Sequence, residues 1–133
     1  MPRTTAPARR LQLFGFALAG GLGFVTDAGG LMLGLALGLG PAPARVPAFL
    51  AAVVVTWAVN RHLTFRTTAP PSLREFLRYL AAMGLGLAVN YAVYLLALRI
   101  SDAALAQPVL ALIPATAAGM GANFLTARHV LNR

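Results

Sequence analysis

Long runs of apolar residues, separated by short polar and proline-rich stretches, dominate the chain. A membrane-spanning helix needs roughly 20 apolar residues. Four runs reach that length, and they cover residues 11–37, 46–65, 73–98 and 106–130. Alternation of apolar and polar positions, which is typical of barrel strands, is absent. The pattern predicts an all-α, polytopic membrane protein with four transmembrane helices and no soluble module.

The second half of the chain repeats the first in degraded form. The spacing is 63 residues in one part and 67 in the other. The pairs at the two spacings are Gly21 and Gly84, Gly23 and Gly86, Asp27 and Asn90, then Pro47 and Pro114, Trp57 and Phe124, Arg61 and Arg128. We expect a tandem 2+2 repeat whose halves keep the same orientation. One membrane domain, 11–133, would comprise repeat one (11–66), a linker (67–72) and repeat two (73–133), after a disordered N-terminus (1–10).

Composition and charge agree with a membrane location. Hydrophobic residues make up 59% of the chain and charged residues 11%, which is too few charges to cover a soluble domain. Nine of the eleven basic residues lie before the first run, around the central linker or at the C-terminus, leaving Arg45 and Arg99 for the other two connections. The positive-inside rule then predicts cytoplasmic termini. The basic residues do not gather on a soluble face with aromatic neighbours, so no nucleic-acid partner is expected.

The candidate chemistry is binding rather than catalysis. The sequence offers neither a Ser/His/Asp set, nor paired carboxylates, nor a glycine loop in the strand–helix setting of a nucleotide site. His62 and His129 have no adjacent Cys, Asp or Glu with which to hold a metal. We therefore expect no catalytic residue, no metal and no cofactor.

Asp27 is an acidic residue well inside an apolar run, and its counterpart Asn90 is polar but neutral. An ionised side chain in the bilayer is costly, so such residues face a bundle interior, a wet cavity or a partner. Two interpretations stand. Asp27 and Asn90 either form a shared polar site, or Asp27 is protonated and makes an interhelical hydrogen bond.

A polar stripe leads toward the cytoplasmic end of the second run. Thr56 and Asn60 lie four residues apart and share a helix face, and Asn123 is the counterpart of Thr56. Arg61 and Arg128 stand at the foot of the two stripes. The planar guanidinium suits a phosphate, although arginines at helix ends also rest among lipid headgroups.

Two surfaces favour contacts with other helices or with lipid. Gly30, Gly34 and Gly38 recur every four residues, a spacing typical of close helix packing. Ser72 can cap the following helix, with Glu75 three residues later. The first turns of that helix, residues 72–79, are amphipathic and are expected to lie partly in the membrane interface.

Several motifs resemble those of the GtrA-like family of small four-helix membrane proteins. They are Phe14-Gly15-Phe16, Gly21-x-Gly23, Asp27, Asn60-Arg61-His62-Leu63-Thr64-Phe65, Phe76-Leu77-Arg78-Tyr79-Leu80, Asn90 and Asn123-Phe124 with Arg128. The resemblance covers roughly residues 11–131. Thr56-Trp57 departs from the family's Asn-Phe, and Ala127 replaces the asparagine seen at position 60, so the two halves are unequal.

The resemblance implies translocation of a polyprenyl-phosphate-linked monosaccharide from the inner to the outer leaflet. The implied partners are that lipid and a membrane glycosyltransferase, at the inner (cytoplasmic) membrane. Four helices of this length make a bundle too slim to enclose a hydrophilic path alone, so a second copy of the chain is also expected. We expect the arginines to bind the phosphate and the polar stripe to bind the sugar. Asp27 and Asn90 would form a further polar binding site along the path. The expected substrate-binding residues are Arg61, Arg128, Asn60, Asn123, Thr56, Asp27, Asn90, Arg78 and His62. Two alternatives remain: a non-transporting anchor for a glycosyltransferase, and a small proton-coupled exporter.

Overall fold

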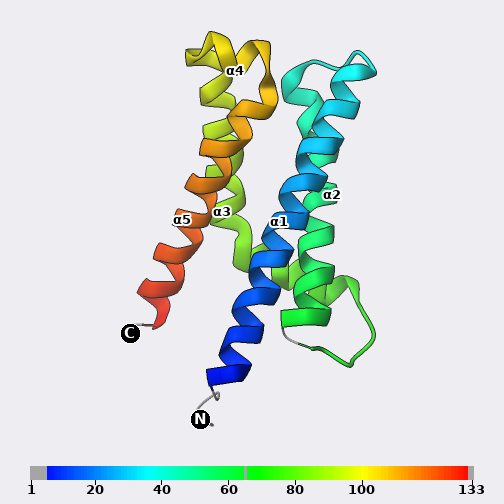
Figure 1. Ribbon diagram of the computed structural model, residues 1–133, viewed down its shortest axis with the longest axis vertical. Helices are drawn as coiled ribbons and strands as arrows, with labels where there is room; N and C mark the ends of the chain where they lie inside the picture. Colours follow the sequence, from blue (N-terminus) through cyan, green and yellow to red (C-terminus); the bar gives the residue numbers. More distant parts are fainter. Residues whose placement is uncertain (1–5, 65, 132–133) are drawn as a thin grey trace. The chain divides into compact units, whose positions relative to one another are not determined.

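The computed structural model describes residues 6–64 and 66–131, without the side chains of Ala6, Phe124 and 126–131. Every regular element in this part is helical (Figure 1), which confirms the predicted all-α class. Three of the described helices are long and apolar enough to cross a membrane: Pro7–Ala36, Pro41–Thr64 and Leu73–Ile100. The expected fourth span, 106–130, is not among them and stays a prediction.

The first compact unit comprises residues 1–71. Its helices α1 (Ala6–Ala36) and α2 (Pro41–Val59) lie side by side in opposite directions (Figure 1), and α2 continues into a π-helical turn, η1 (Asn60–Thr64). Gly38 lies in the connection with φ of +89°, a conformation that suits glycine because it has no Cβ. A very short connection therefore returns the chain directly along α1.

Helix α2 begins earlier than the sequence predicted. The helix starts at Pro41 rather than near residue 46. Proline is tolerated there because the first N–H groups of a helix have no intrahelical acceptor. Arg45 consequently lies inside α2 and not in a polar connection. At the other end of the unit, residues 6–10, which the sequence analysis expected to be disordered, belong to α1.

Small residues form the contact between α1 and α2. A Cβ added to Gly30 would stand 2.8 Å from the Cβ of Ala48, and one added to Gly34 would stand 2.9 Å from the Cβ of Ala44. Such distances leave no room for a side chain, so the two backbones approach closely. The glycine face thus packs against α2 of the same unit.

The second compact unit, residues 72–133, contains four helical elements. They are α3 (Leu73–Ile100), α4 (Asp102–Ala106), the 3₁₀ turn η2 (Pro108–Ala111) and α5 (Leu112–Leu131). Helices α3 and α5 run side by side, while α4 and η2 connect them at one end (Figure 1). This unit is therefore also a helix pair, with a more structured connection than that of the first.

Helix α3 is longer than a membrane span requires. Its 28 residues correspond to about 42 Å at 1.5 Å per residue, against a hydrocarbon core of about 30 Å. Figure 1 shows its first turns bent away from the direction of the rest. Ser72 caps this first segment as predicted, because its Oγ accepts a hydrogen bond of 3.2 Å from the backbone N–H of Glu75. Exposed Leu77 and Arg78 agree with the amphipathic character expected there.

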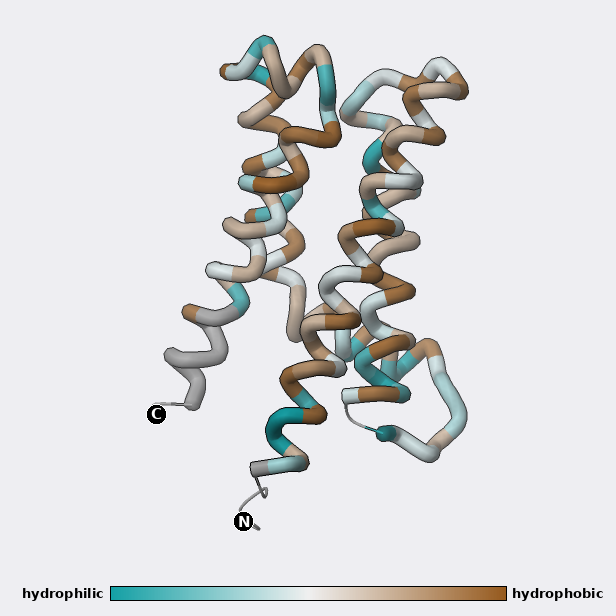
Figure 2. The backbone as a smooth tube through the Cα atoms, viewed as in Figure 1, coloured by the Kyte–Doolittle hydropathy of each residue, from teal (hydrophilic) through white to brown (hydrophobic). Residues whose placement is uncertain are grey.

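Apolar residues recur along the long helices (Figure 2), and many of their large side chains are exposed. Large side chains such as Phe14 (68% exposed), Leu33 (61%) and Leu125 (63%) point away from the helix contacts. In water this much exposed apolar surface would drive association. In a bilayer the same side chains face lipid, which agrees with a multi-pass membrane location.

Candidate functional site

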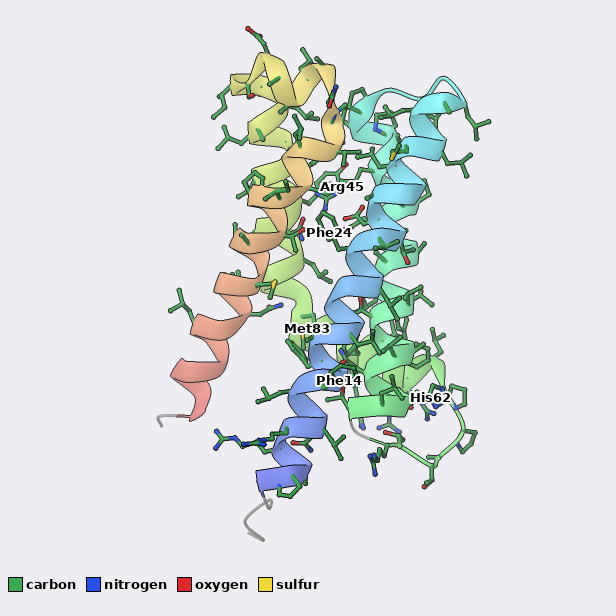
Figure 3. All side chains as sticks on the ribbon, in the orientation of Figure 1. Phe14, Phe24, Arg45, His62 and Met83 are labelled. Carbon is green, nitrogen blue, oxygen red and sulfur yellow. The ribbon has the colours of Figure 1, made fainter. Side chains whose placement is uncertain are left out.

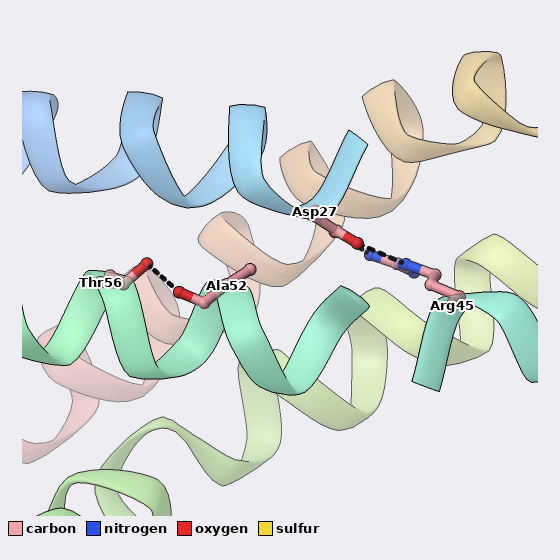
Figure 4. Close-up of polar contacts among 4 residues, drawn as sticks. All are labelled: Asp27, Arg45, Ala52 and Thr56. Carbon is pink, nitrogen blue, oxygen red and sulfur yellow. Dashed lines mark hydrogen bonds and ion pairs between the residues drawn. The ribbon is translucent and has the colours of Figure 1, made fainter. Parts of the chain in front are cut away.

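A buried ion pair joins α1 to α2 within the first unit (Figure 4). One terminal nitrogen of Arg45, NH2, donates to Oδ2 of Asp27 at 2.9 Å, and its Nε lies 3.5 Å from Oδ1. Arg45 is fully buried and Asp27 is 5% exposed. The guanidinium also stacks on Phe49, with 4.7 Å between Cζ and the ring centroid. These contacts fix the planar group in one orientation.

Thr56 continues the polar groups along α2. Its hydroxyl donates to the carbonyl of Ala52, one turn earlier, at 2.8 Å (Figure 4). A Cβ on Gly23 of α1 would come within 2.3 Å of this hydroxyl oxygen. The glycine therefore leaves the space in which the threonine hydroxyl lies between the helices.

The π-helical turn η1 holds three of the predicted site residues, and two of them, Asn60 and Arg61, are buried. Asn60 Oδ1 accepts a hydrogen bond of 2.9 Å from the hydroxyl of Thr64. The Arg61 guanidinium donates to the carbonyl of Ala69, and the Arg61 carbonyl accepts from the N–H of Thr67 at 2.9 Å. Arg61 is only 4% exposed, so it binds the linker and does not extend among lipid headgroups.

His62 differs from its two neighbours in η1. Its side chain is exposed, and Figure 3 places it at the opposite end of the α2–η1 segment from Arg45. An exposed imidazole at a helix end suits the membrane interface, where its polar ring remains hydrated. The structure therefore separates His62 from the buried polar groups.

In the second unit, Asn123 of α5 makes a polar contact with α3. Its Oδ1 accepts from the backbone N–H of Gly86 at 3.1 Å, and its Nδ2 lies 3.6 Å from Sδ of Met83. A Cβ on Gly86 would come within 2.3 Å of the Asn123 amide. Helix bends occur where a side chain inserts at the backbone hydrogen bonds, and this contact lies in the first half of α3, where the helix bends.

The remaining predicted residues of this unit are Asn90, Arg78 and Arg128. Asn90 is half-buried beside α5, where a Cβ on Gly119 would stand 2.8 Å from the Asn90 Cβ. Arg78 is exposed on the first turns of α3. The side chain of Arg128 lies outside the described part of the structure, so its predicted role is untested.

The two units use matching positions for their polar contacts. Gly23 and Thr56 in the first unit correspond, at spacings of 63 and 67 residues, to Gly86 and Asn123 in the second. In each unit the glycine makes room for a polar side chain of the facing helix. The predicted residues thus fall into two groups, each within its own helix pair.

Arg45, the residue that pairs with Asp27, was not among the predicted site residues. Arg45 was placed in the connection because the second apolar run was taken to begin at residue 46. A signal was available, since a buried carboxylate needs a cationic or hydrogen-bonding partner. Arg45 is the first basic residue after the apolar run 11–37, which contains Asp27.

The fold and these contacts define a helical, multi-pass membrane protein with polar groups between its paired helices. Residues 15–131 match the family model for the GtrA/DPMS transmembrane domain, and the chain belongs to this family. Its members are membrane proteins involved in handling polyprenyl-linked sugars, and the family is generally non-catalytic. Searches of curated proteins and of solved structures found no match.

Proposed function

We propose that the protein moves a polyprenyl-phosphate-linked monosaccharide from the cytoplasmic to the outer leaflet. One observation carries this proposal: polar groups follow one another along the contact of a helix pair whose outer surface is apolar. From one end of α2–η1 to the other they are Asn60, Thr56, and Asp27 with Arg45. Hydroxyl and phosphate groups that leave water need such partners, whereas the prenyl tail stays in lipid.

Within this proposal, the first capture of the lipid involves exposed arginines rather than the buried Arg61. Arg61 already binds the carbonyl of Ala69, so a phosphate would have to displace the linker to reach it. Arg66, just before the linker, and Arg74 and Arg78, just after it, are exposed. We assign to them the first attraction of the phosphate, and to Arg61 a later contact made as the linker moves.

The finer topology is part of the same proposal. It has four membrane spans, with α5 as the fourth, arranged as a tandem 2+2 repeat with both termini in the cytoplasm. The recurring glycine–polar contact, Gly23 with Thr56 and Gly86 with Asn123, supports the repeat. The lipid would be made by a membrane glycosyltransferase at the inner membrane, and a second copy of the chain would complete the path.

Reconstitution tests the function directly. The purified full-length protein is inserted into liposomes that contain a labelled short-chain polyprenyl-phosphate sugar. We expect protein-dependent exposure of the lipid to an impermeant reagent on the opposite side, and loss of that acceleration in Arg61→Ala/Arg128→Ala. Absence of acceleration by folded, correctly inserted wild-type protein would contradict the proposal.

A non-transporting anchor for a glycosyltransferase is the second candidate. It is favoured by the start of α3, where Leu73 (72% exposed) and Leu77 (54%) accompany exposed Arg74 and Arg78. The Gly30/Gly34 face, which was the other expected docking surface, is occupied by α2. Loss of a co-purified enzyme on Leu73→Ser/Leu77→Ser, with translocation absent, would favour the anchor. For the exporter alternative, Asp27 is the required carboxylate, and it already has Arg45 as its partner.

A further inference from the structure

The ion pair of the first unit has no charged counterpart in the second. At the matching spacings, Asp27 corresponds to Asn90 and Arg45 to Leu112. Leu112 is fully buried, as is Arg45. Helices α3 and α5 nevertheless pack side by side. The helix-pair fold therefore forms at these positions without the two charges.

This comparison argues against packing as the reason for the charges. Replacing a buried ion pair by apolar residues of similar volume is often neutral or stabilising. The second unit has no charge at either matching position, since it carries the polar but neutral Asn90 and the apolar Leu112. The first unit retains both charges and additionally holds the guanidinium against Phe49. An oriented, desolvated guanidinium is the group that proteins use to bind carboxylates and phosphates with two parallel hydrogen bonds.

We propose that Arg45 binds the phosphate of the transported lipid in exchange for Asp27, and that Asp27 then accepts hydrogen bonds from the sugar. The inference rests on the proposed function and extends it to substrate selection. A glycosyl phosphate supplies both missing partners, an anionic acceptor for Arg45 and hydroxyl donors for Asp27. The pair thereby distinguishes a lipid that carries a sugar from one that carries phosphate alone.

The selectivity follows from the hydrogen bonds that a bare phosphate cannot provide. Once Arg45 has turned to a phosphate, the Asp27 carboxylate, an acceptor only, needs donors. A bare polyprenyl phosphate has no sugar hydroxyls with which to supply them, and a buried acceptor without a donor is costly. Because Arg45 is fully buried, the substrate reaches it only when α1 and α2 part locally. The pair closes this path when no substrate is present.

The test compares two lipids in one assay. Wild-type protein is reconstituted in liposomes with a nitrobenzoxadiazole-labelled short-chain polyprenyl phosphate, either with or without a glucosyl group. Dithionite quenching gives the two translocation rates. We expect the glucosylated lipid to move at least about tenfold faster, which corresponds to about 1.4 kcal/mol.

The decisive variant removes the charges at the two positions of the first unit, as in the second unit. Asp27→Asn/Arg45→Leu removes both charges together, and size-exclusion chromatography with thermal unfolding checks that it folds. We expect slower movement of the glucosylated lipid and a rate ratio near one. Arg45→Lys, which keeps the charge but lacks the planar fork, is expected to lower the ratio by several fold and serves if the double variant does not fold. Asp102→Asn/Arg99→Leu is the matched control, since both side chains are exposed outside the site.

The outcomes separate the two proposals. If the wild type moves neither lipid, the proposed function fails and this inference fails with it. If it moves both lipids equally, or if the ratio survives in the folded double variant, the function stands and the role of the pair is overturned. A ratio that falls in the pair variants but not in the control supports it.

Discussion

The two helix pairs bury matching positions with different chemistry. Positions buried in both units, 63 or 67 residues apart, include Gly23 and Gly86, Leu31 and Tyr94, Ala44 and Ala111, Ala48 and Ala115. In contrast, the charged Asp27 and Arg45 face each other in the first unit, where the second has Asn90 and Leu112. Both charges are present in one unit and both are absent in the other. A buried charge needs its partner, so the two positions have to change together.

The largest effect is expected from separating the pair. Asp27→Asn leaves Arg45 buried without its carboxylate, which typically costs about 3–5 kcal/mol. We expect a loss of that size in the free energy of unfolding, measured by reversible denaturation in mixed micelles. Adding Arg45→Leu to Asp27→Asn should recover most of the loss.

The second unit provides the comparison for this experiment. Asn90→Ala removes a neutral, half-buried amide and should cost about 1 kcal/mol, the usual value of one hydrogen bond. Equal losses for Asp27→Asn and Asn90→Ala would show that the charged pair is energetically no different from the neutral position. The comparison between the units would then lose its physical basis.

A smaller effect is expected where the first unit ends. Arg61→Leu removes the hydrogen bond from its guanidinium to the Ala69 carbonyl, and bonds to charged groups contribute about 1.5–3 kcal/mol. The Thr67 N–H, which donates to the Arg61 carbonyl, should then exchange with deuterium faster. Hydrogen exchange followed by mass spectrometry measures this. Arg128→Leu in the other unit is the control, and similar acceleration at Thr67 in that variant would contradict a local contact.

The fold was largely predictable because it depends on long apolar runs. Three of the four expected runs coincide with helices that can span a membrane, and the Ser72 cap was correctly predicted from local sequence. The start of α2 was not, because proline at position 41 fits either the end of a connection or the first turn of a helix. That ambiguity of a few residues decided whether Arg45 was assigned to a connection or to the contact between helices.

The candidate site was predictable only as a set of residue types. Thr56 and Asn60 were expected to share a face, and both do lie on the α2–η1 segment, but their hydrogen-bond partners depend on the packed structure. Arg61 was expected at the membrane interface, where it would either bind a phosphate or extend among lipid headgroups. The π-helical turn and the returning linker instead bury it. These are tertiary effects that no local pattern records.

Adding a methyl group at the matched glycines tests whether the glycine–polar contacts of the two units are equivalent. Gly23→Ala and Gly86→Ala would each place Cβ about 2.3 Å from polar atoms of the facing helix, and overpacking typically costs about 1–3 kcal/mol. We expect similar losses of unfolding free energy in the two variants. Thr56→Ala should relieve the first and Asn123→Ala the second, and double-mutant cycles measure the coupling. A rescue in one unit only would show that the two contacts are not equivalent.

The smallest effect is expected at two helix N-termini. They belong to α2, the second helix of the first unit, and to α3, the first helix of the second unit. Helix α3 begins with Ser72, whose Oγ accepts the N–H of Glu75, and losing such a cap costs about 1 kcal/mol. Helix α2 begins after Gly40, which makes no side-chain cap, and Pro41 has no N–H to satisfy. Ser72→Ala should therefore lower the unfolding free energy by about 1 kcal/mol.

Gly40→Ala is the matched variant for that measurement. Gly40 has φ of −67° and ψ of 162°, which any residue adopts, and an added Cβ would stand 3.6 Å from Pro43, an ordinary contact. Its effect should remain within about 0.5 kcal/mol, as at most surface positions. If Gly40→Ala costs as much as Ser72→Ala, then backbone entropy and not the serine hydroxyl governs both helix starts. A clear difference would mean that α3 depends on a side-chain cap where α2 relies on proline.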